Sequence, residues 1–274
     1  MNLSQSLQSA SLTDPGRVRD HNEDCIESRP QIGLFVLADG MGGYNAGEVA
    51  SGMATSLIAD GLEETWRQRD VDRLGREEAK ALSERLMREQ IARANSAIFT
   101  TSQNNPECAG MGTTLVVCLF YDNFVTVAHI GDSRLYRLRG DAMEQVTRDH
   151  SLLQEQLDSG LITPEEAKLS QNKNLVTRAL GIDPTVEPEI HVYETQPEDV
   201  FLLCSDGLSD MVEDDEIRLT MTTLKSNPTL TVQQLVQAAN DNGGRDNISA
   251  MLIRVAEPYG VPRGFIARLK ALFR

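Results

Sequence analysis

Apolar residues along the chain follow two different spacings. Short runs rich in β-branched and aromatic residues predict strands at residues 32–38, 113–121, 124–130, 133–139, 199–205 and 247–255. Apolar positions three or four residues apart predict helices at residues 47–64 and 77–100. Because Asp122 and Asn123 suit a tight turn between two of these strands, an antiparallel sheet with helices on its faces is favoured over a parallel βαβ sheet.

Two segments depart from this alternation. Residues 149–178 form a polar, helix-like insert between strands, in which Thr163 suits a helix N-cap and Pro164 its first turn. We interpret this insert either as a solvated connector or as a flap over a site. The segment after Glu257 contains four basic residues and no acidic one, and its apolar residues suit one face of a short helix. Such a tail either docks on a partner or an anionic surface, or packs on the acidic body.

Composition narrows the possible partners and location. The formal net charge of −15 argues against non-specific binding to nucleic acid and favours a cationic partner or a divalent metal. The four cysteines form no CxxC pair, which predicts reduced thiols in a cytoplasmic protein. No secretory signal and no run of about 20 apolar residues is present, so we expect a soluble chain without a membrane span.

Carboxylates recur where predicted strands end. Asp39 and Asp206 each follow an apolar run and precede glycine, and further acids stand at strand edges or in NEDCIE near the start, namely Glu23, Asp24, Asp132 and Asp246. One Asp-Gly pair is a common turn, but this recurrence indicates convergence. Two like charges about 4 Å apart cost roughly 4 kcal/mol at an effective dielectric constant near 20, so a cation must lie among them. Histidines at ligand spacing and cysteine pairs are too few for zinc, and oxygen ligands favour Mg²⁺ or Mn²⁺.

Other readings of the motifs fit less well. The glycine-rich run GMGGYN, which starts at Gly40, fails the GxGxxG pattern at its last position, and the chain contains no GK pair for a P-loop. No cysteine is followed six residues later by arginine, and neither GxSxG nor HExxH occurs. Because Asp39 directly precedes the glycines and would repel a bare phosphate, we interpret them as allowing the backbone to approach a metal site.

Seven short motifs occur in an order typical of one enzyme family. They are GRVRDHNED (16–24), VLADGMGG (36–43), GTTLVV (112–117), HIGDSRLY (129–136), LVTRALG (175–181), LCSDGLSD (203–210) and GGRDNIS (243–249). With them the chain resembles the metal-dependent type-2C protein phosphatases (the PPM family), above all their bacterial serine/threonine branch, over roughly residues 8–255. The resemblance implies an α+β fold, a four-layer αββα sandwich of two antiparallel sheets flanked by helices. It also implies one catalytic domain at residues 1–256, with a flap at about 149–178, followed by the basic tail at 257–274.

The resemblance also assigns metal ligands by motif position. It implies that Asp39 bridges two metal ions, that Gly40 offers its carbonyl to one of them, and that Asp206 and Asp246 complete the other. Asp132 matches a residue that helps to hold a third ion in bacterial members. The implied cofactors are therefore two core Mn²⁺ or Mg²⁺ ions, with a third as an open alternative.

Further positions concern the metals' waters, the phosphate and the leaving group. Glu23 and Asp24 match the acidic pair that binds the metals' waters, and Arg19 matches the family's phosphate-holding arginine. Met41 stands where many eukaryotic members carry a histidine as a proposed general acid. We therefore hypothesise that a water near Asp132 protonates the leaving oxygen.

The function implied is hydrolysis of phosphoserine and phosphothreonine in proteins by metal-activated water, by a monomer that opposes a serine/threonine kinase. A regulatory pseudo-phosphatase on the same fold would be expected to lose metal carboxylates, whereas Asp39, Asp206 and Asp246 are all present. A metal hydrolase for small phosphorylated metabolites remains the third hypothesis.

Overall fold

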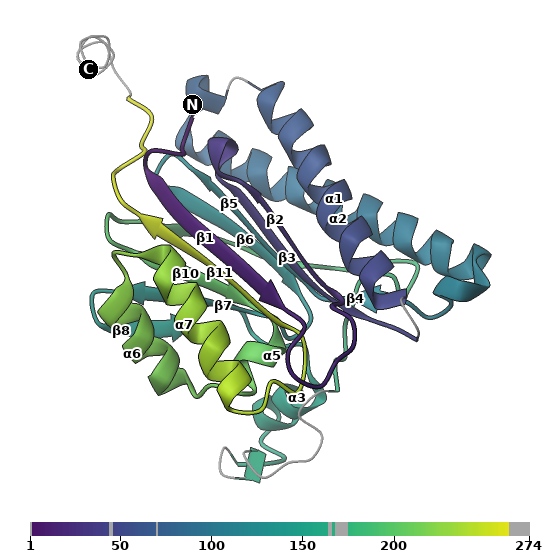
Figure 1. Cartoon of the computed structure of the whole chain (residues 1–274). Helices are drawn as coiled ribbons and strands as arrows, with labels where there is room; N and C mark the ends of the chain where they lie inside the picture. The colour runs from purple at the N-terminus through teal and green to yellow at the C-terminus, as the bar shows by residue number, and fades with distance from the viewer. Residues whose placement is uncertain (1, 44–45, 70, 164–165, 168–174, 263–274) are drawn as a thin grey trace.

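Two antiparallel sheets stacked face to face form the centre of the molecule (Figure 1). The computed structural model describes residues 2–262 except 44–45, 70, 164–165 and 168–174. One sheet has the strand order β1 (Leu7–Asp14), β11 (Ile248–Val255), β10 (Val200–Cys204), β7 (Arg134–Arg139) and β8 (Ala142–Gln145). The other has the order β2 (Asp24–Arg29), β3 (Leu34–Met41), β5 (Leu115–Tyr121), β6 (Phe124–Ile130) and β9 (Glu189–Glu194), and the short β4 (Gly112–Thr113) pairs with the end of β3.

Helices cover the outer face of each sheet. The long helices α1 (Ala46–Arg67) and α2 (Arg76–Asn104) lie on the β2–β9 sheet, whereas α6 (Asp214–Leu224) and α7 (Pro228–Asp241) lie on the β1–β8 sheet (Figure 1). The short helices α3 (Leu152–Asp158) and α5 (Asp206–Ser209) lie near the lower end of the view. Single 3₁₀ turns occur at Pro30–Ile32, Val71–Arg73 and Pro106–Cys108.

Three apolar layers separate these four layers of secondary structure. Along β3, Phe35 and Leu37 face the other sheet while Leu34 and Val36 face the helices, because successive strand side chains point to opposite faces. Between the sheets, the Phe120 ring meets those of Phe35 and Phe201 edge-on, with centroids 5.8 and 5.3 Å apart. A third layer packs β10 and β11 against α6 and α7. The four-layer αββα fold is therefore confirmed.

The six predicted strands and two predicted helices are present, with small differences at their ends. The expected strand at residues 113–121 divides into β4 and β5. The two are separated by Thr114, whose amide donates a hydrogen bond to the Asp39 carbonyl. Asp122 and Asn123 form the predicted hairpin turn with φ of 47° and 60°. Beyond the predicted elements, the structure also has β1, β2, β8, β9, α6 and α7. All four cysteines are free thiols.

The two unusual segments are described in part. The insert at 149–178 contains the helix α3. Further along it, the Glu166 amide donates to the Thr163 hydroxyl, which is the N-cap contact expected there. Pro164 lies outside the described residues. In the expected tail, Tyr259 is buried between the sheets, and its hydroxyl lies 2.6 Å from that of Thr195. Residues 263–274 lie outside the described part. Among the described helices, none is both long and apolar enough to cross a membrane.

Candidate functional site

A cleft of about 320 Å³ is lined by residues at the end of β3 and the start of α5, two elements that lie toward the lower part of the view in Figure 1. The structure brings seven of the eight predicted site residues to its walls, which are Arg19, Glu23, Asp39, Gly40, Asp132, Asp206 and Asp246. Asp24, the eighth, lies behind them and is only 8% exposed. Met41, Gly42, Thr114 and Val176 complete the lining. Residues that are distant in the sequence therefore form one acidic cleft.

The backbone of Asp39 is fixed by the segment that precedes β5. The Asp39 amide donates to the Thr114 hydroxyl at 3.0 Å, and its carbonyl accepts from the Thr114 amide and the Thr113 hydroxyl, both at 2.8 Å. Because these bonds satisfy the main chain at the end of β3, the Asp39 side chain is held facing the cleft.

Asp24 lies directly opposite Asp39 in the β2–β3 ladder. Opposed like charges destabilise a strand pair unless a cation or a proton intervenes. One Asp24 oxygen accepts from the Ser205 hydroxyl at 2.8 Å, whereas the other is buried without a hydrogen-bond partner in the structure. Burial, offset in part by the hydrogen bond from Ser205, raises the pKa of Asp24 to about 6. The pair therefore favours a bound cation.

The remaining carboxylates add to this negative field. Burial, followed by repulsion from Asp24, Asp206 and Asp132, raises the pKa of Asp39 well above its ordinary value. Burial and the charge of Asp132 do the same for the pKa of Asp206. Asp132 is 7% exposed, and burial together with Asp149 raises its pKa to about 6. Without a positive charge, these groups cannot all ionise at neutral pH at low cost.

One guanidinium group supplies positive charge at the rim. Arg19, in the loop between β1 and β2, lies 2.7 Å from a carboxylate oxygen of Asp246, and its side chain is 51% exposed. This hydrogen bond is the main cause of a raised Arg19 pKa. The other Asp246 oxygen accepts from the Asn247 amide at 2.8 Å, just before β11. Arg19 therefore places a half-exposed guanidinium group beside the carboxylates that line the cleft.

Two glycines on either side of the β3–α1 connection, Gly40 and Gly47, serve close packing between β3 and α1. A Cβ at Gly40 would lie 2.2 Å from the Gly47 carbonyl oxygen, and a Cβ at Gly47 would lie 2.7 Å from the Glu23 carboxylate. The Gly40 amide donates to the Glu23 carbonyl at 3.1 Å. Small residues at both positions therefore allow α1 to begin directly beside the acidic cleft, with Glu23 near the positive end of the helix.

Two contributors were not identified from the sequence. Asp210 adds to the negative potential at both Asp132 and Asp206, and its position four residues after Asp206 in LCSDGLSD was the available signal. Thr114 links Asp39 to Ser133, whose hydroxyl lies 2.7 Å from the Thr114 hydroxyl. That link depends on two strands meeting in the fold, and no local sequence pattern indicates it.

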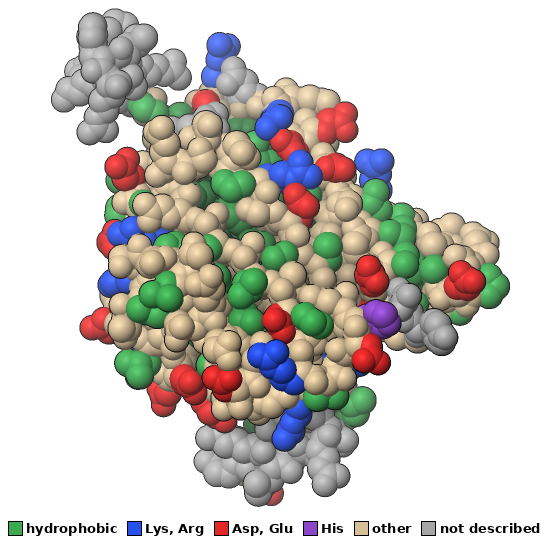
Figure 2. Space-filling view, viewed as in Figure 1, with side chains coloured by type: hydrophobic (Ala, Val, Ile, Leu, Met, Phe, Trp, Pro, Cys, Tyr) green, Lys and Arg blue, Asp and Glu red, His purple; other side chains and the backbone are tan. Residues whose placement is uncertain are grey.

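The donor set of the cleft fits a hard divalent cation. Its side chains offer carboxylate oxygens, one of which, on Asp24, is buried without a hydrogen-bond partner. Oxygen donors of this kind suit Mg²⁺ and Mn²⁺ better than zinc. Elsewhere on the view in Figure 2, acidic side chains gather over α6 at the lower left, where the first turn holds Asp214, Asp215 and Glu216, but these are surface groups.

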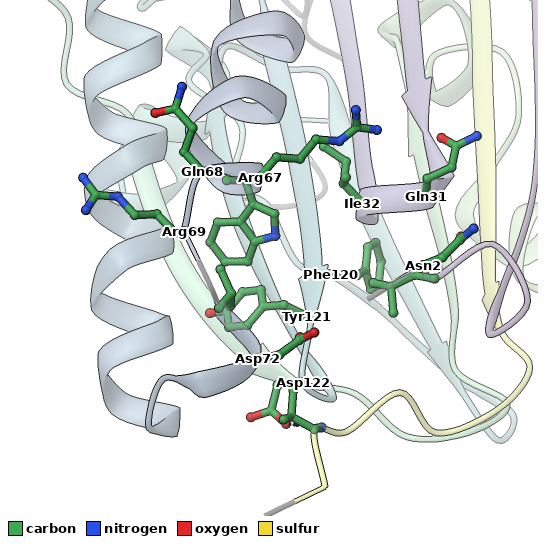
Figure 3. Close-up of a pocket in the computed structure, with 14 residues that line it drawn as sticks. Asn2, Gln31, Ile32, Arg67, Gln68, Arg69, Asp72, Phe120, Tyr121 and Asp122 are labelled. Carbon is green, nitrogen blue, oxygen red and sulfur yellow. Dashed lines mark hydrogen bonds between the residues drawn. The ribbon is translucent and has the colours of Figure 1, made fainter. Parts of the chain in front are cut away.

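A second cavity, of about 680 Å³, lies at the other end of the sandwich. In Figure 3, Arg67 lies above Tyr121 and Asp122 below it, while Phe120 and Asn2 lie to the right. Asp122 accepts from the Val261 amide at 2.7 Å and so helps to fix the chain near its C-terminal end. Aromatic, amide, arginine and acidic groups mix here, so this larger cavity lacks the concentrated acidity of the cleft.

Three side chains of metal-binding type also meet outside the cleft. The possible ligand atoms of His129, His150 and Glu189 lie within 4.8 Å of one another. However, His150 Nε2 lies 3.1 Å from a Glu189 oxygen, and His129 Nε2 lies 2.9 Å from the Arg148 carbonyl. Burial lowers the pKa of both histidines, and their rings stack with centroids 4.8 Å apart. Hydrogen bonding between neutral rings and their neighbours accounts for this cluster.

Comparison with known proteins gives a consistent result. The family model described as protein phosphatase 2C matches residues 8–248. A serine/threonine phosphatase (stp) of Listeria innocua is 38% identical over 246 residues, which cover 88% of this chain and 93% of the relative. The crystal structure of the Mycobacterium tuberculosis serine/threonine phosphatase PstP/Ppp superposes with a TM-score of 0.81 at 35% identity and covers 92% of this chain and 99% of that one. The catalytic domain of PstP in complex with two manganese ions gives a TM-score of 0.78 at 36% identity, with 92% and 99% coverage.

Proposed function

Because the chain belongs to the protein phosphatase 2C family, we propose that it hydrolyses phosphoserine and phosphothreonine in proteins with the help of Mn²⁺ or Mg²⁺. The observation that carries this proposal is the acidic cleft, where Asp39, Asp206 and Asp246 converge beside Arg19. Relatives named as serine/threonine phosphatases support the reaction, and the manganese complex of a neighbour supports the metal.

Each residue of the cleft has a proposed task. Asp39, Asp206, Asp246 and the Gly40 carbonyl would hold two divalent ions, and Glu23 and Asp24 would bind their waters. When bound, such ions lower the pKa of water and offset charge on phosphoryl oxygens. The planar Arg19 fork, exposed at the mouth, would donate two N–H groups to the phosphate and orient it.

Proton delivery to the leaving oxygen needs a different group from Met41, whose thioether has no proton to give. We assign this task to a water oriented by Asp132, a buried acid that lines the same cleft and would also help to hold a third ion. If Asp132→Asn left phosphopeptide turnover unchanged, this assignment would be wrong.

The decisive assay is hydrolysis of p-nitrophenyl phosphate with added Mn²⁺ and again with EDTA. We expect metal-dependent turnover in the wild type and a loss of at least a hundredfold in Asp39→Asn. Asp215→Asn, whose side chain is 94% exposed on α6, provides a control carboxylate and should behave as the wild type. Metal-independent turnover would refute the proposal, and a wild type without any turnover would favour a pseudo-phosphatase.

Substrate class separates the proposal from a small-metabolite hydrolase. We propose that the substrates are phosphoproteins made by a serine/threonine kinase, which this monomer would oppose. A phosphothreonine peptide should compete with p-nitrophenyl phosphate at lower concentration than sugar phosphates do. Stronger inhibition by the small esters would instead favour the metabolite enzyme.

The basic tail is proposed as a docking element separate from the catalytic domain. Tyr259 is buried, and the Val261 amide donates a hydrogen bond to Asp122, so both residues are part of the folded body. A deletion that tests the tail should therefore begin after residue 262. We expect deletion of residues 263–274 to preserve p-nitrophenyl phosphate hydrolysis and to reduce capture of a partner or of anionic vesicles. Unchanged capture would show that the tail does not dock there.

A further inference from the structure

The turn that carries Asp132 joins the two sheets and is held on both sides. It connects β6 with β7, and Asp132 at its centre is almost fully buried. On one side, the Ser133 hydroxyl lies 2.7 Å from that of Thr114, which also accepts from the Asp39 amide. On the other side, Gly131 makes its hydrogen bonds with a residue of the flap base.

That residue is His150, which binds both polar backbone atoms of Gly131. The His150 amide donates to the Gly131 carbonyl at 2.9 Å, and the Gly131 amide donates to His150 Nδ1 at 3.2 Å. Gly131 has a φ of +99°, and a Cβ there would lie 2.7 Å from the Thr114 side chain, so glycine is needed for this approach. The conformation of the turn therefore orients the Gly131 amide, and one imidazole nitrogen accepts its hydrogen bond.

The other imidazole nitrogen selects the tautomer that this contact requires. His150 Nε2 lies 3.1 Å from a Glu189 carboxylate oxygen, which can only accept a hydrogen bond when ionised. The proton of a neutral ring therefore sits on Nε2, and the Nδ1 lone pair remains available to the Gly131 amide. Glu189, on β9, thus acts on the turn through the ring of His150.

His150 also lies at the junction of both ends of the flap. The Thr177 amide donates to the His150 carbonyl at 2.8 Å, and Ser151 pairs with Val176 in an isolated antiparallel bridge. Val176 in turn lines the acidic cleft. The entering and leaving segments of the flap are therefore fastened to the residue that holds Gly131.

We propose that His150 is a positioning residue, which fixes the Asp132 turn relative to the base of the flap through its Nδ1 acceptor. The part of this inference that concerns metal binding by Asp132 rests on the proposed function. A purely structural role, in which the ring only stacks on His129, would depend on ring shape and not on which nitrogen accepts.

Two amide substitutions separate these possibilities. In His150→Asn the carbonyl oxygen is attached to Cγ, as Nδ1 is, and can accept from Gly131, whereas the contact with Glu189 is lost. In His150→Gln the amide nitrogen lies one bond further out, as Nε2 does, and can reach Glu189, whereas the acceptor for Gly131 is lost. His191→Asn, an exposed histidine on β9, is the matched control.

The primary readout is hydrogen exchange of the Gly131 amide by NMR in the metal-free full-length protein. We expect protection in the wild type, His191→Asn and His150→Asn, and faster exchange by up to about tenfold in His150→Gln, because the Gly131 amide loses its acceptor there. The second readout is the Mn²⁺ concentration for half-maximal turnover, which should rise up to about tenfold in His150→Gln and change less than about threefold in His150→Asn.

The outcomes are distinct. Equal Gly131 exchange in His150→Asn and His150→Gln, whether both fast or both slow, would overturn the positioning role, because only His150→Asn keeps an acceptor at the place of Nδ1. If exchange separates the variants but Mn²⁺ dependence does not, the link between the turn and metal binding is refuted. A wild type without phosphatase activity would refute the proposed function, while the exchange data would still decide how the turn is held.

Discussion

Replacing Asp39 with asparagine is expected to stabilise the metal-free protein. Asp39 and Asp24 are directly opposed across two strands, where such pairs lie about 5 Å apart, so two charges there cost about 3 kcal/mol at an effective dielectric constant near 20. Because the wild type relieves part of this repulsion by binding protons, we expect a net gain of about 2 kcal/mol. That gain corresponds to a rise in melting temperature of about 4–8 °C.

Thermal unfolding in EDTA and in Mn²⁺ at pH 7.5 tests this expectation. The wild type should gain stability on addition of Mn²⁺, whereas Asp39→Asn should start higher in EDTA and gain much less, because it lacks the predicted bridging ligand. Asp215→Asn should match the wild type in both conditions. A lower melting temperature for Asp39→Asn in EDTA would refute the reasoning, because it would mean that the carboxylate stabilises the fold without metal.

The same electrostatics predict how the stability of the metal-free protein varies with pH. Asp24 and Asp132 have pKa values of about 6 in the fold, above the ordinary 3.8, so the fold favours their protonated forms. Their contribution to stability is complete below about pH 3.8 and is lost as the pH rises through 6, by at most about 3 kcal/mol for each group. Urea unfolding in EDTA between pH 4.5 and 7.5 should show this decline in the wild type, and a smaller decline in Asp24→Asn and in Asp132→Asn, each of which lacks one of the two groups. A parallel pH dependence of all three proteins would contradict the prediction.

Three further substitutions test other parts of the structure. Arg19→Lys keeps the charge but loses the planar fork, so KM for a phosphopeptide should rise about tenfold with little change in Mn²⁺ dependence; an unchanged KM would exclude phosphate binding by Arg19. Phe120→Ala should lower the free energy of unfolding by about 3–5 kcal/mol in urea titrations, because it empties the centre of the inter-sheet layer. Asp199→Asn should cost about 1–3 kcal/mol by weakening two hydrogen bonds from Arg139, and a neutral effect would show that the pair contributes nothing.

Strands buried on both faces could be predicted from sequence because burial makes them almost continuously apolar. LVVCLFY in β5 is an example, with every residue buried. β1 and β9 are half-exposed and mix polar with apolar residues, so their spacing gives a weak signal. The helices α6 and α7 were missed although the sequence contains a signal for them, since Val232, Leu235, Val236 and Ala239 of α7 are spaced as on one helix face.

Local patterns also limited what could be predicted of the site. Asp39 and Asp206 carry a visible signal, an apolar strand followed by Asp-Gly. The opposition of Asp24 and Asp39 depends on the β2–β3 register, and β2 has no clear pattern of its own. The contact of His150 with Gly131 joins residues 19 positions apart, with the β7–β8 hairpin between them, so only the folded chain reveals it.

The ends of the described chain meet on the side of the molecule away from the acidic cleft. Asn2, Leu3 and Val261 line the same cavity, at the top of the view in Figure 1, while the end of β3 and the start of α5, which line the cleft, lie toward the lower part. A fluorophore or surface attached to the chain near Asn2 or Val261 would therefore lie away from the cleft. Tethering the enzyme beside a phosphorylated target would raise the effective concentration of substrate without reshaping the site, so immobilised enzyme should retain the kcat of the free form.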